Sequence, residues 1–554
     1  MPTLDWIGKQ AVVNHHNEVP FHLLKEVPEL SVGDPGSGNL LVEGDNLQAL
    51  KALLPYYAGQ VKCIYIDPPY NTGDENWAYN DNVNSPEMRK WLGKTVGKEM
   101  EDLSRHDKWL CMMFPRIVLL KEFLREDGVL FVSIDENEVG HLRLLLSEIF
   151  GERNTLGTLV WKRRSSSAMR GTPLSIDHEY VLVFARDIKK VMLYGLQKTV
   201  DGYPHEDSRG RYASTDLTIG MGKDARPGQY YPISNPRTGV EYQPNPERIW
   251  RFYPETMNKV IEQDLIIWPD EKGGKMTRPR YKTYYDPETE KPKPVSSWIE
   301  SKSTNNSQLN EDEIEYGISI LTSGMTQEGG KILQHILGTK MFAYPKPLSL
   351  IRSIVKASTR DNDIILDSFA GTGTTGHAVL SLNSEDGFNR HFVLIEIDED
   401  ICQNVTTERL KRVSLGYERE DGKKVEKLGG SFRYARIGAA CFDEYGRINK
   451  EVSFFELARH VFFTETGEPL PGKKRFNSSR IGIHKETAIY LLYNGILKDK
   501  SVNGGNVLTQ KVLSALPRYE GMKVIYGTAC RLSPARLKRE KIIFKQIPYE
   551  IRIQ

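Results

Sequence analysis

The chain has 554 residues, of which 39% are hydrophobic and 27% charged, so length and composition indicate a globular protein of several domains. No uncharged apolar run reaches the roughly 18 residues of a membrane span, residues 1–10 lack a secretory signal pattern, and five scattered cysteines form neither a disulfide framework nor a metal-ligand pair, so we expect a cytoplasmic protein. The net charge of +2 leaves nucleic-acid binding open, because such binding needs only a local basic surface.

Strand-like and helix-like segments alternate between residues 39 and 186. Apolar runs rich in β-branched residues predict strands, and apolar residues at helical spacing predict helices. Such alternation favours a parallel sheet with helices on its faces. The predicted strands are Val61–Ile66, Gly128–Ile134 and His178–Ala185, and the predicted helices are Trp109–Leu124 and Glu138–Phe150.

The pattern is interrupted after about Asp187 and then returns. Up to about Ser307 the chain is rich in Tyr, Trp, Pro, Gly, Lys and Arg and has little periodicity, which fits a separate, irregular or β-rich module. Each alternating block supplies only a few strands, so we expect the two blocks to be halves of one sheet. The second block is predicted to hold helices at Leu348–Ala357, Gly376–Leu382 and Ile401–Val413 and strands at Asp363–Asp367 and His391–Ile397.

A third region starts near Arg436 and contains an amphipathic helix near Phe454–Phe463. Together, these changes in composition and periodicity divide the chain into five expected segments. They are an N-terminal segment 1–38, one half of the sheet 39–186, an insert 187–335, the other half 336–435 and a C-terminal domain 436–554.

A glycine-rich turn follows the predicted strand that ends at Asp367. Glycines let the backbone pass close beneath a ligand, and the following helix N-terminus favours negative charge such as a carboxylate. The next strand ends in Glu396, whose carboxylate can accept both ribose hydroxyl protons. Gly371, Gly373 and Gly376 also satisfy the dinucleotide fingerprint, so an NAD-dependent oxidoreductase and an idle strand–helix turn both stay open.

The sharper signal is the turn Asp67–Tyr70, at the end of an apolar strand. Its two prolines fix the backbone and offer no N–H donors, so a carboxylate, a carbonyl and an aromatic ring project. The lone pair of adenine N6 is delocalised into the ring, and Asp67 and the Pro68 carbonyl can each accept one N6 proton and free that lone pair. Stacking on Tyr70 is worth about 1–3 kcal/mol. The alternative is a turn that only ends the strand.

These two motifs resemble those of the amino-group DNA methyltransferases. Asp67–Tyr70 is similar to their catalytic motif, and Asp367–Gly373 is similar to their AdoMet loop. The catalytic motif comes first, a long insert follows, and the AdoMet loop comes last, which is the order of the β-class. In that class Asp, rather than Ser, before Pro-Pro-Tyr implies adenine N6 over cytosine N4.

Further short segments make the chain similar to the modification (Mod) subunits of type III restriction-modification systems. The resemblance is strong over residues 39–186 and 336–413 and looser elsewhere. The segments are Gly44–Asn46, Asn71–Gly73, Ser133–Asp135, His178–Glu179, Tyr344–Pro347 and, near the end of the chain, Gln546–Glu550.

The resemblance implies a permuted Rossmann-like AdoMet-dependent methyltransferase sheet with an inserted target-recognition domain and a C-terminal domain. It implies AdoMet as cofactor, no metal, a flipped adenine in double-stranded DNA as substrate, a homodimer, and a separate ATP-dependent restriction subunit as partner. The catalytic residues would be Asp67, Pro68, Pro69 and Tyr70, and the cofactor-binding residues Asp45, Lys346, Asp367, Phe369, Gly371, Gly373, Thr374 and Glu396.

Two further segments of the sequence carry weaker functional signals. The segment Gly467–Lys474 is close to a phosphate-binding loop but lacks the Ser or Thr for magnesium, so we expect a solvent loop and no ATPase. The basic segment 161–170 fits DNA phosphate contacts or a solvated loop equally well.

An oxidoreductase leaves Asp67–Tyr70 without a role, and the intact motifs argue against a non-catalytic scaffold. Methylation of cytosine N4 or of RNA stays open.

Overall fold

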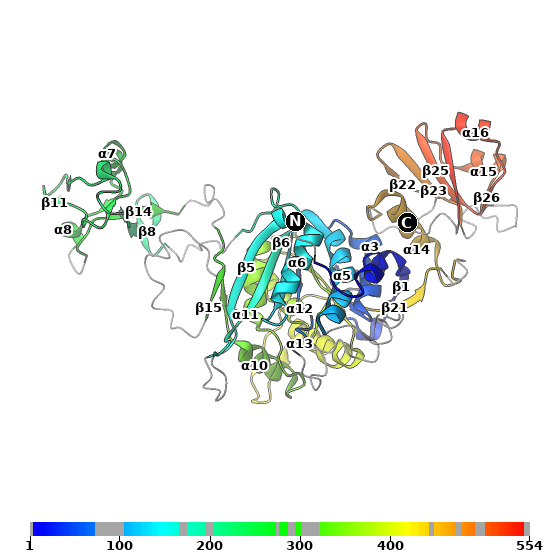
Figure 1. Cartoon of the computed structure of the whole chain (residues 1–554), viewed down its shortest axis with the longest axis horizontal. Coiled ribbons are helices and arrows are strands. Elements are labelled where there is room, and N and C mark those ends of the chain that lie inside the picture. The colour runs from blue at the N-terminus through cyan, green and yellow to red at the C-terminus, as the bar shows by residue number, and fades with distance from the viewer. Residues whose placement is uncertain are drawn as a thin grey trace. The chain divides into compact units, whose positions relative to one another are not determined.

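The computed structural model describes residues 4–72, 105–165, 174–194, 203–272, 276–285, 294–301, 321–442, 448–470, 478–493 and 505–547. The chain divides into two compact units (Figure 1). The first unit comprises residues 1–192, 297–301 and 321–554, and the second comprises residues 193–296 and 302–320.

The first unit is built on an eleven-stranded sheet within the described residues, in the order β1-β21-β2-β18-β17-β3-β4-β6-β5-β15-β16. The six strands from β21 to β4 run parallel, whereas β1, and β6 with its neighbours β4 and β5, pair antiparallel. The strands are β1 (His22–Glu26), β2 (Leu40–Glu43), β3 (Val61–Ile66), β4 (Leu124–Ile134), β5 (Thr155–Lys162), β6 (His178–Ala185), β15 (Trp298–Ser301), β16 (Thr322–Ser323), β17 (Ile364–Asp367), β18 (His391–Glu396) and β21 (Arg433–Ala440).

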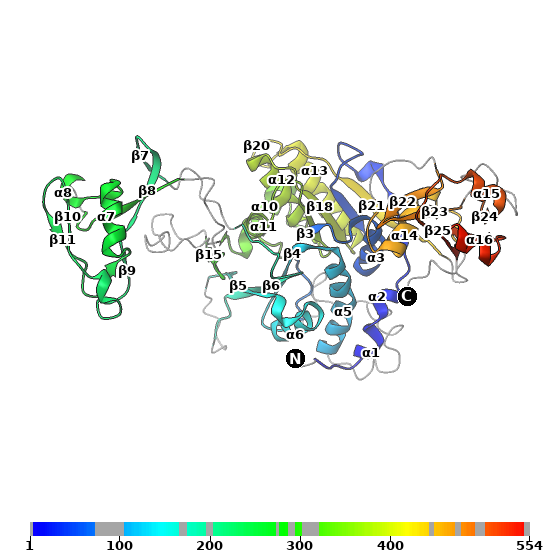
Figure 2. The same ribbon diagram turned by 90° about the horizontal axis from the view of Figure 1, so that it is seen from above.

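Helices cover both faces of this sheet, as Figure 2 shows from above. One layer holds α3 (Asn46–Tyr57), α5 (Arg105–Phe123) and α6 (Val139–Phe150), with the short α1 (Lys9–Val12) and α2 (His15–Glu18) packed on α5. The other layer holds α10 (Thr326–Leu337), α11 (Leu348–Ser358), α12 (Thr374–Asp386) and α13 (Glu408–Leu415), the last preceded by a π-helical segment Ile401–Thr407.

The central strands are continuous apolar runs because helices cover both of their faces. All six residues of β3 are buried, and Lys62 is the charged exception. Its ammonium group donates to the main-chain oxygen of Asp127 at 2.6 Å and lies 2.9 Å from the Asp127 carboxylate. The predicted α/β fold, a Rossmann-like sheet interrupted by an inserted module, is confirmed.

A topological switch point lies between β3 and β17, which pair in parallel. From β3 the chain crosses through α5 to β4 on one side, and from β17 it crosses through α12 to β18 on the other. Ligands of open α/β sheets bind outside the carboxyl ends of the strands at such a point. Asp67 follows β3 directly and Asp367 ends β17, so the two sequence motifs meet there.

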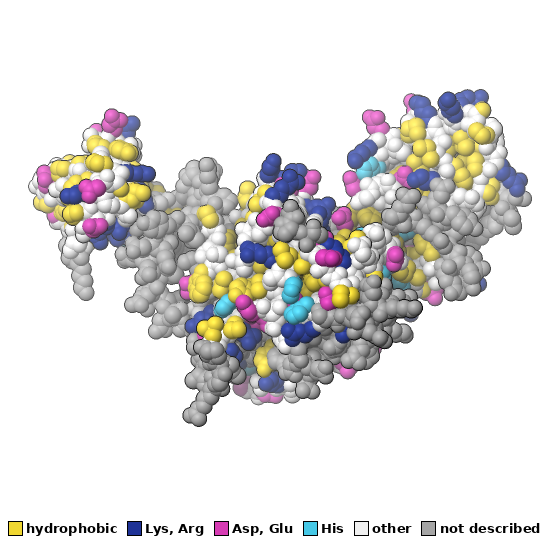
Figure 3. Space-filling model, in the orientation of Figure 1, with side chains coloured by type: hydrophobic (Ala, Val, Ile, Leu, Met, Phe, Trp, Pro, Cys, Tyr) yellow, Lys and Arg dark blue, Asp and Glu magenta, His cyan; other side chains and the backbone are white. Residues whose placement is uncertain are grey.

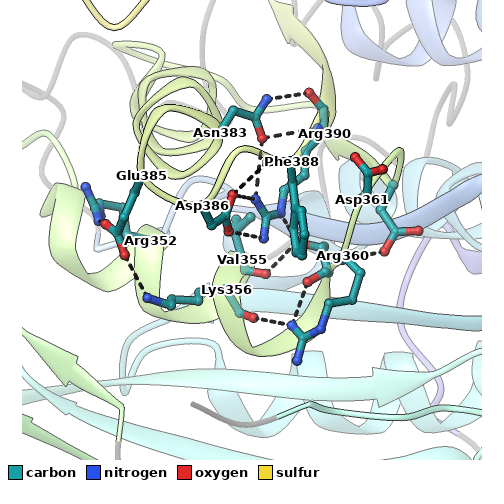
Figure 4. A network of polar contacts seen from close by, with 12 residues as sticks. Arg352, Val355, Lys356, Arg360, Asp361, Asn383, Glu385, Asp386, Phe388 and Arg390 are labelled. Carbon is teal, nitrogen blue, oxygen red and sulfur yellow. Dashed lines mark hydrogen bonds and ion pairs between the residues drawn. The ribbon is translucent and has the colours of Figure 1, made fainter. Parts of the chain in front are cut away.

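Polar contacts fasten α12 to α11 on the second layer (Figure 4). Glu385 accepts from Lys356 at 2.7 Å and from Arg352, and both basic residues belong to α11. Arg390, after α12, pairs with Asp386 at 2.8 Å. Because α12 begins at Thr374, these contacts hold the helix whose N-terminus carries the glycine loop.

The second unit has its own core around Leu217, Trp250, Met257 and Trp268. A four-stranded sheet in the order β13-β14-β8-β7 and two small ribbons, β9 with β12 and β10 with β11, surround it. These elements confirm the β-rich module expected from the composition. They are β7 (His205–Asp207), β8 (Gly210–Asp216), β9 (Thr218–Ile219), β10 (Ile233–Ser234), β11 (Glu241–Tyr242), β12 (Ile249–Trp250), α7 (Pro254–Glu262), β13 (Ile266–Ile267), α8 (Pro269–Lys272) and β14 (Arg280–Tyr284).

The C-terminal region of the first unit contains a four-stranded sheet β22-β23-β25-β27 and a ribbon β24-β26. The predicted amphipathic helix near Phe454 is α14, which begins with a capping box of Ser453 and Glu456 and packs against α3. The elements after β18 are β19 (Tyr417–Glu418), β20 (Lys424–Val425), α14 (Phe454–Thr466), β22 (Arg480–His484), β23 (Thr487–Leu491), β24 (Val507–Leu508), α15 (Gln510–Ala515), β25 (Met522–Gly527), β26 (Ala529–Cys530), α16 (Pro534–Arg539) and β27 (Ile542–Gln546).

Three expected segment boundaries need correction. The segment 1–38 is not separate, because β1 pairs with β21 at one edge of the central sheet. The insert is shorter than 187–335, because β15 pairs with β5 and α10 packs on α13, so both belong to the first unit. The second half of the sheet extends past residue 435, because β21 continues to Ala440.

Some of the weaker sequence signals lie partly outside the described residues. Trp161 and Lys162 end β5, but residues 166–170 are not described. Gly467 ends α14 with a φ of 69°, whereas residues 471–477 and 548–554 are not described. Among the helices of the described ranges, none combines the length and apolar character needed to cross a lipid bilayer.

Candidate active site

A small cavity at the carboxyl ends of β3 and β17 brings the two predicted motifs together. Asp67 of the first motif and the main part of the glycine loop share its wall, so one bound molecule can touch both. The lining residues are Tyr65, Asp67, Phe342, Tyr344, Pro345, Lys346, Asp367, Phe369, Ala370, Gly371, Thr372, Thr374 and Thr375.

Asp67 presents a buried acceptor to this cavity. Its Oδ2 lies 2.8 Å from the Nζ of Lys346, whereas its buried Oδ1 has no hydrogen-bond partner among the residues that the structure describes. Burial raises the pKa of Asp67, and the neighbouring Lys346 ammonium opposes that shift. Because buried polar atoms are nearly always paired in folded proteins, the orphaned Oδ1 fits an N–H donor supplied by a ligand.

Lys346 lies at the catalytic motif, although it was expected among the cofactor-binding residues. Its ammonium is 2.8 Å from Asp67, 3.6 Å from Glu179 and 4.7 Å from the ring centroid of Tyr70. Burial lowers the pKa of Lys346, but the two carboxylates outweigh it and leave the pKa above its ordinary value. Lys346 also touches the other half of the site, because its main-chain oxygen accepts from the Thr374 hydroxyl at 3.5 Å.

Glu179 belongs to a segment that the family resemblance named, but it was not among the expected catalytic or cofactor-binding residues. Its Oε2 accepts from the Tyr70 hydroxyl at 3.1 Å, and its Oε1 pairs with Arg163 at 2.8 Å. Burial, Asp67 and Glu179 together raise the pKa of Tyr70 well above its ordinary value, so the phenol stays neutral. The available signal was a carboxylate at the start of the apolar strand β6, where a buried acid needs a partner.

The Asp-Pro-Pro-Tyr turn is held from behind by the start of α5. The indole N–H of Trp109 donates to the Pro69 carbonyl at 2.6 Å. Asn71 adopts a left-handed conformation with a φ of 58°, and its side-chain amide donates to Glu138. The Pro69 carbonyl already accepts the hydrogen bond from Trp109. We therefore assign to the Pro68 carbonyl, as the sequence predicts, the acceptance of one N6 proton.

Asp367 shapes the glycine loop from inside. Its Oδ1 accepts from the Phe369 amide at 3.0 Å, and its Oδ2 accepts from the Thr375 hydroxyl at 2.6 Å. Burial raises the pKa of Asp367 to about 7. Gly371 and Gly373 have φ angles of 50° and 72°, in the left-handed region that glycine tolerates at no steric cost. Asp367 therefore acts first on the loop's backbone.

Glu396 faces the same loop from the end of β18 and is 1% exposed. Its Oε2 accepts from the Gly371 amide at 2.7 Å, and its Oε1 accepts from the Asp398 amide at 2.8 Å. Each carboxylate oxygen has a second acceptor site, so ribose hydroxyls can still be bound. Burial raises the pKa of Glu396 to about 8, so the free protein holds much of this carboxyl protonated near neutral pH.

Asp45 lies where the two halves join. It caps α3 by accepting from the Gln48 amide at 3.0 Å, and it pairs with the buried Arg116 at 3.1 Å. The neighbouring Asn46 amide donates to the Ser368 carbonyl of the glycine loop at 3.3 Å. The structure therefore places Asp45 near the other expected cofactor residues.

Arg409 is a second residue that the sequence reasoning missed. It is fully buried beneath the glycine loop and donates to the hydroxyls of Thr372 at 2.9 Å and Thr374 at 2.8 Å. Burial lowers the pKa of Arg409 to about 9. The basic side chain of α13 thereby fixes two hydroxyls that line the cavity.

Comparison with known proteins gives the family. The sequence model of the N6/N4 DNA methylases, described as DNA methylase, matches residues 61–408. The chain is 29% identical to the Mod subunit of the type III restriction-modification enzyme StyLTI of Salmonella typhimurium, over 84% of this chain and 70% of that protein. It is 32% identical to the EcoPI Mod subunit of Escherichia phage P1, over 75% of this chain and 66% of that protein.

The solved structure of M1.HpyAVI in complex with SAM covers 67% of this chain and 98% of its own at 13% identity, with a TM-score of 0.31, too low to add to the fold assignment. The family match and the relatives confirm the predicted family, the predicted DNA methyltransferase activity and AdoMet as cofactor. They favour neither cytosine N4 methylation nor an oxidoreductase. The chain belongs to the N6/N4 DNA methylase family and is an AdoMet-dependent, adenine-specific DNA methyltransferase.

Proposed function

We propose that Asp67 and the Pro68 carbonyl hold the N6 amine of an adenine flipped out of duplex DNA, against AdoMet held by the glycine loop. The observation that carries this proposal is the buried Oδ1 of Asp67, which has no hydrogen-bond partner within the described ranges and lies in the cavity that Asp67 shares with Gly371. Flipping is needed because N6 inside a duplex cannot reach a cofactor in such a cavity.

The two acceptors activate a poor nucleophile. Each accepts one N6 proton, which draws the nitrogen toward a tetrahedral geometry and localises its lone pair. Bound AdoMet supplies the methyl group as an electrophile. Transfer would form the N–C bond as the bond between the methyl carbon and the AdoMet sulfur breaks, with the thioether as leaving group. N6 would then carry an extra proton, and the carboxylate of Asp67 is the base within reach. Burial raises the pKa of Asp67, and the Lys346 ammonium 2.8 Å away opposes that rise because it favours the ionised carboxylate.

Tyr70 stacks on the flipped base. Lys346 lies 4.7 Å from its ring centroid, and Glu179 fixes its hydroxyl. Both contacts hold the ring in one orientation before the base arrives, so less conformational entropy is lost on binding. Asp45, Asp367, Phe369, Gly371, Gly373, Thr374 and Glu396 form the cofactor side, with Glu396 accepting from the ribose hydroxyls.

The second compact unit is the target-recognition domain in this proposal. Tyr253 is 55% exposed, and a Cβ on Gly228 would lie 3.4 Å from its ring, so the ring stands beside the segment 221–228. That segment exposes Lys223 and Arg226. Basic side chains next to an exposed aromatic ring suit a surface that contacts phosphates and base edges.

We also propose that the enzyme works in the cytoplasm and as part of a larger assembly. The relatives are named Mod subunits of type III restriction-modification enzymes, which supports a modification subunit that pairs with an ATP-dependent restriction subunit. A homodimer, in which one protomer reads DNA while its partner methylates, matches the expectation for a β-class enzyme.

The role of Asp67 predicts a split between catalysis and cofactor binding. Asp67→Ala is expected to lower methyl transfer by at least about 10²–10⁴-fold, the range for losing a positioned proton acceptor, while AdoMet affinity stays near that of the wild type. Single-turnover transfer of labelled methyl groups and calorimetry measure the two quantities. Asp67→Ser is the companion variant, and partial activity there would mean that the turn supplies much of the effect. Near-normal turnover of Asp67→Ala would contradict the mechanism.

Glu396 predicts a pH dependence of AdoMet binding. Only the ionised carboxylate can accept both ribose hydroxyl protons, and the pKa of Glu396 is about 8 in the free protein. AdoMet affinity should therefore rise with pH, by about tenfold between pH 7 and 9, and flatten above. Calorimetry in buffers of different ionisation enthalpy measures affinity and proton release together. Glu396→Gln should bind more weakly and lose this part of the slope, and an unchanged slope would remove Glu396 from the ribose site.

The recognition role of the second unit predicts transferable specificity. Exchanging residues 193–296 for the matching insert of a related methyltransferase is expected to change the methylated DNA sequence and to leave AdoMet affinity unchanged. Sequencing of modified bases in plasmid DNA reads the target directly. As a finer arm, Lys223→Ala with Arg226→Ala should weaken DNA binding and flatten its salt dependence. An unchanged target sequence would assign recognition to another region or to a partner.

Division of labour between protomers predicts complementation. Asp67→Ala retains the recognition unit, and a chain with a disabled insert retains the catalytic site, so a mixture of these inactive chains should regain methylation through heterodimers. Light scattering gives the oligomeric state, and each variant alone is the control. Absence of rescue from a mixture of monomers would refute the proposed dimer.

A further inference from the structure

Two histidines and a glutamate converge behind the catalytic turn, at the start of α5 and α6. Nδ1 of His106 lies 2.6 Å from Oε1 of Glu138, and Nδ1 of His141 lies 2.8 Å from Oε2 of the same carboxylate. One ligand atom from each of the three side chains can be chosen so that all lie within 4.8 Å of one another. None of these residues takes part in the mechanism above.

The local sequence produces this arrangement. Glu138 is the N-cap residue of α6, and His141 follows three positions later, so both side chains lie on one side of the first helical turn. His106 is the second residue of α5, which packs against α6. A Glu-x-x-His pair on one helix with a ligand from a neighbouring helix is a spacing that supports metal binding inside helical bundles.

The charge balance of the cluster leaves room for a cation. Glu138 is fully buried, and in the part of the chain that the structure describes its ion-pair partners are the two histidines, with no Lys or Arg among them. A buried carboxylate is costly without a paired charge or a metal. The histidine side chains are 36% and 39% exposed, so an ion and its waters can approach from solvent. Figure 3 shows histidine side chains on the molecular surface in this view.

We propose that His106, Glu138 and His141 bind one divalent first-row transition-metal ion, with Zn²⁺ as the reference ion. Two imidazoles and one carboxylate form a donor set that suits such ions, with solvent water in the remaining positions. Ligand atoms around tetrahedral zinc stand about 3.3 Å apart, so the two short contacts to Glu138 must open by under about 1 Å. A pair of ligand atoms at the 4.8 Å limit must close by about 1.5 Å. Rotation of the two partly exposed imidazoles can supply that movement.

The site is tied to the catalytic turn through the carboxylate. Asn71, directly after Tyr70, donates its side-chain amide to Oε1 of Glu138. Carboxylates and imidazoles that bind metals are commonly oriented by such outer hydrogen bonds, and losing one typically costs 10–100-fold in metal affinity. A bound ion would fix the orientation of Glu138 and so restrain its hydrogen bond to Asn71. Because Asn71 adopts its left-handed backbone conformation at the end of the catalytic turn, the ion would restrain that end of the turn as well.

The donor set also predicts selectivity. Mg²⁺ and Ca²⁺ prefer ligand spheres of oxygen atoms, and Mg²⁺ gives up its waters reluctantly. Imidazole nitrogens favour Zn²⁺, Co²⁺ and Ni²⁺ instead. Millimolar Mg²⁺ should therefore leave Zn²⁺ bound to the site.

Cobalt substitution tests the site without using catalysis as its readout. The tag-free full-length protein, stripped with a chelator, is titrated with Co²⁺ under visible spectroscopy and with Zn²⁺ in a calorimeter. We expect one ion per chain, with cobalt d–d bands that Zn²⁺ displaces and Mg²⁺ does not. His141→Asn should weaken binding at least about tenfold, because one of three protein ligands is lost. His335→Asn changes an exposed histidine at the end of α10 and should bind as the wild type does.

Two outcomes would overturn the proposal. One is no saturable binding of Co²⁺ or Zn²⁺ by the wild-type chain, and the other is equal binding by the wild type, His141→Asn and His106→Asn. Circular dichroism and the Tm of each variant show that the protein is folded, and the partly exposed His141 is the safest position to change. Glu138→Gln should abolish binding as well. If that buried variant unfolds, the histidine variants still decide the result.

Discussion

The parallel pairing of β3 with β17 is the constraint on which the rest of the molecule depends. The two strands lie far apart in the chain, and their adjacency turns two separate sequence motifs into one site. It also forces the chain outward on both sides of the junction, through α5 and through α12, which opens the sheet where a ligand must enter. The pairing of β3 with β17 is by itself sufficient to make Asp67 and the glycine loop face each other.

The ion pair of Asp67 and Lys346 is better understood as a functional feature than as a source of stability. Removing two charges from water costs several kcal/mol per ion, and a buried pair of this kind often adds little to folding. Here the lysine stands between the carboxylates of Asp67 and Glu179 and reaches the Tyr70 ring. It lets two buried acids coexist, while one oxygen of Asp67 has no hydrogen-bond partner in the described part of the chain.

Sequence alone predicted what depends on neighbours in the chain. The strands around Ile66 and Leu366, the turn at Asp67 and the glycine loop all carry local signals in their composition and spacing. It did not predict the contacts that depend on pairing between distant segments. Glu179 belongs to the site because β6 lies beside β4, and Lys346 reaches Asp67 across the junction of the two halves. The expected insert ran too long because β15 and β16 are short strands at one side of the sheet. Their membership comes from the pairing of β15 with β5 and of β16 with β15 rather than from their own sequence pattern.

The position of the insert along the sheet has an evolutionary consequence. The chain leaves the first unit at residue 192, after β6, and returns to it at residue 297, with β15 beside the edge-side strand β5. No strand of the parallel centre changes its neighbours if the intervening segment is exchanged, because the central register is set by β2, β18, β17 and β3. Recombination between genes of related enzymes at these two points would therefore exchange about a hundred residues without repacking the core. A lineage could acquire a new module in one genetic event and keep its chemistry.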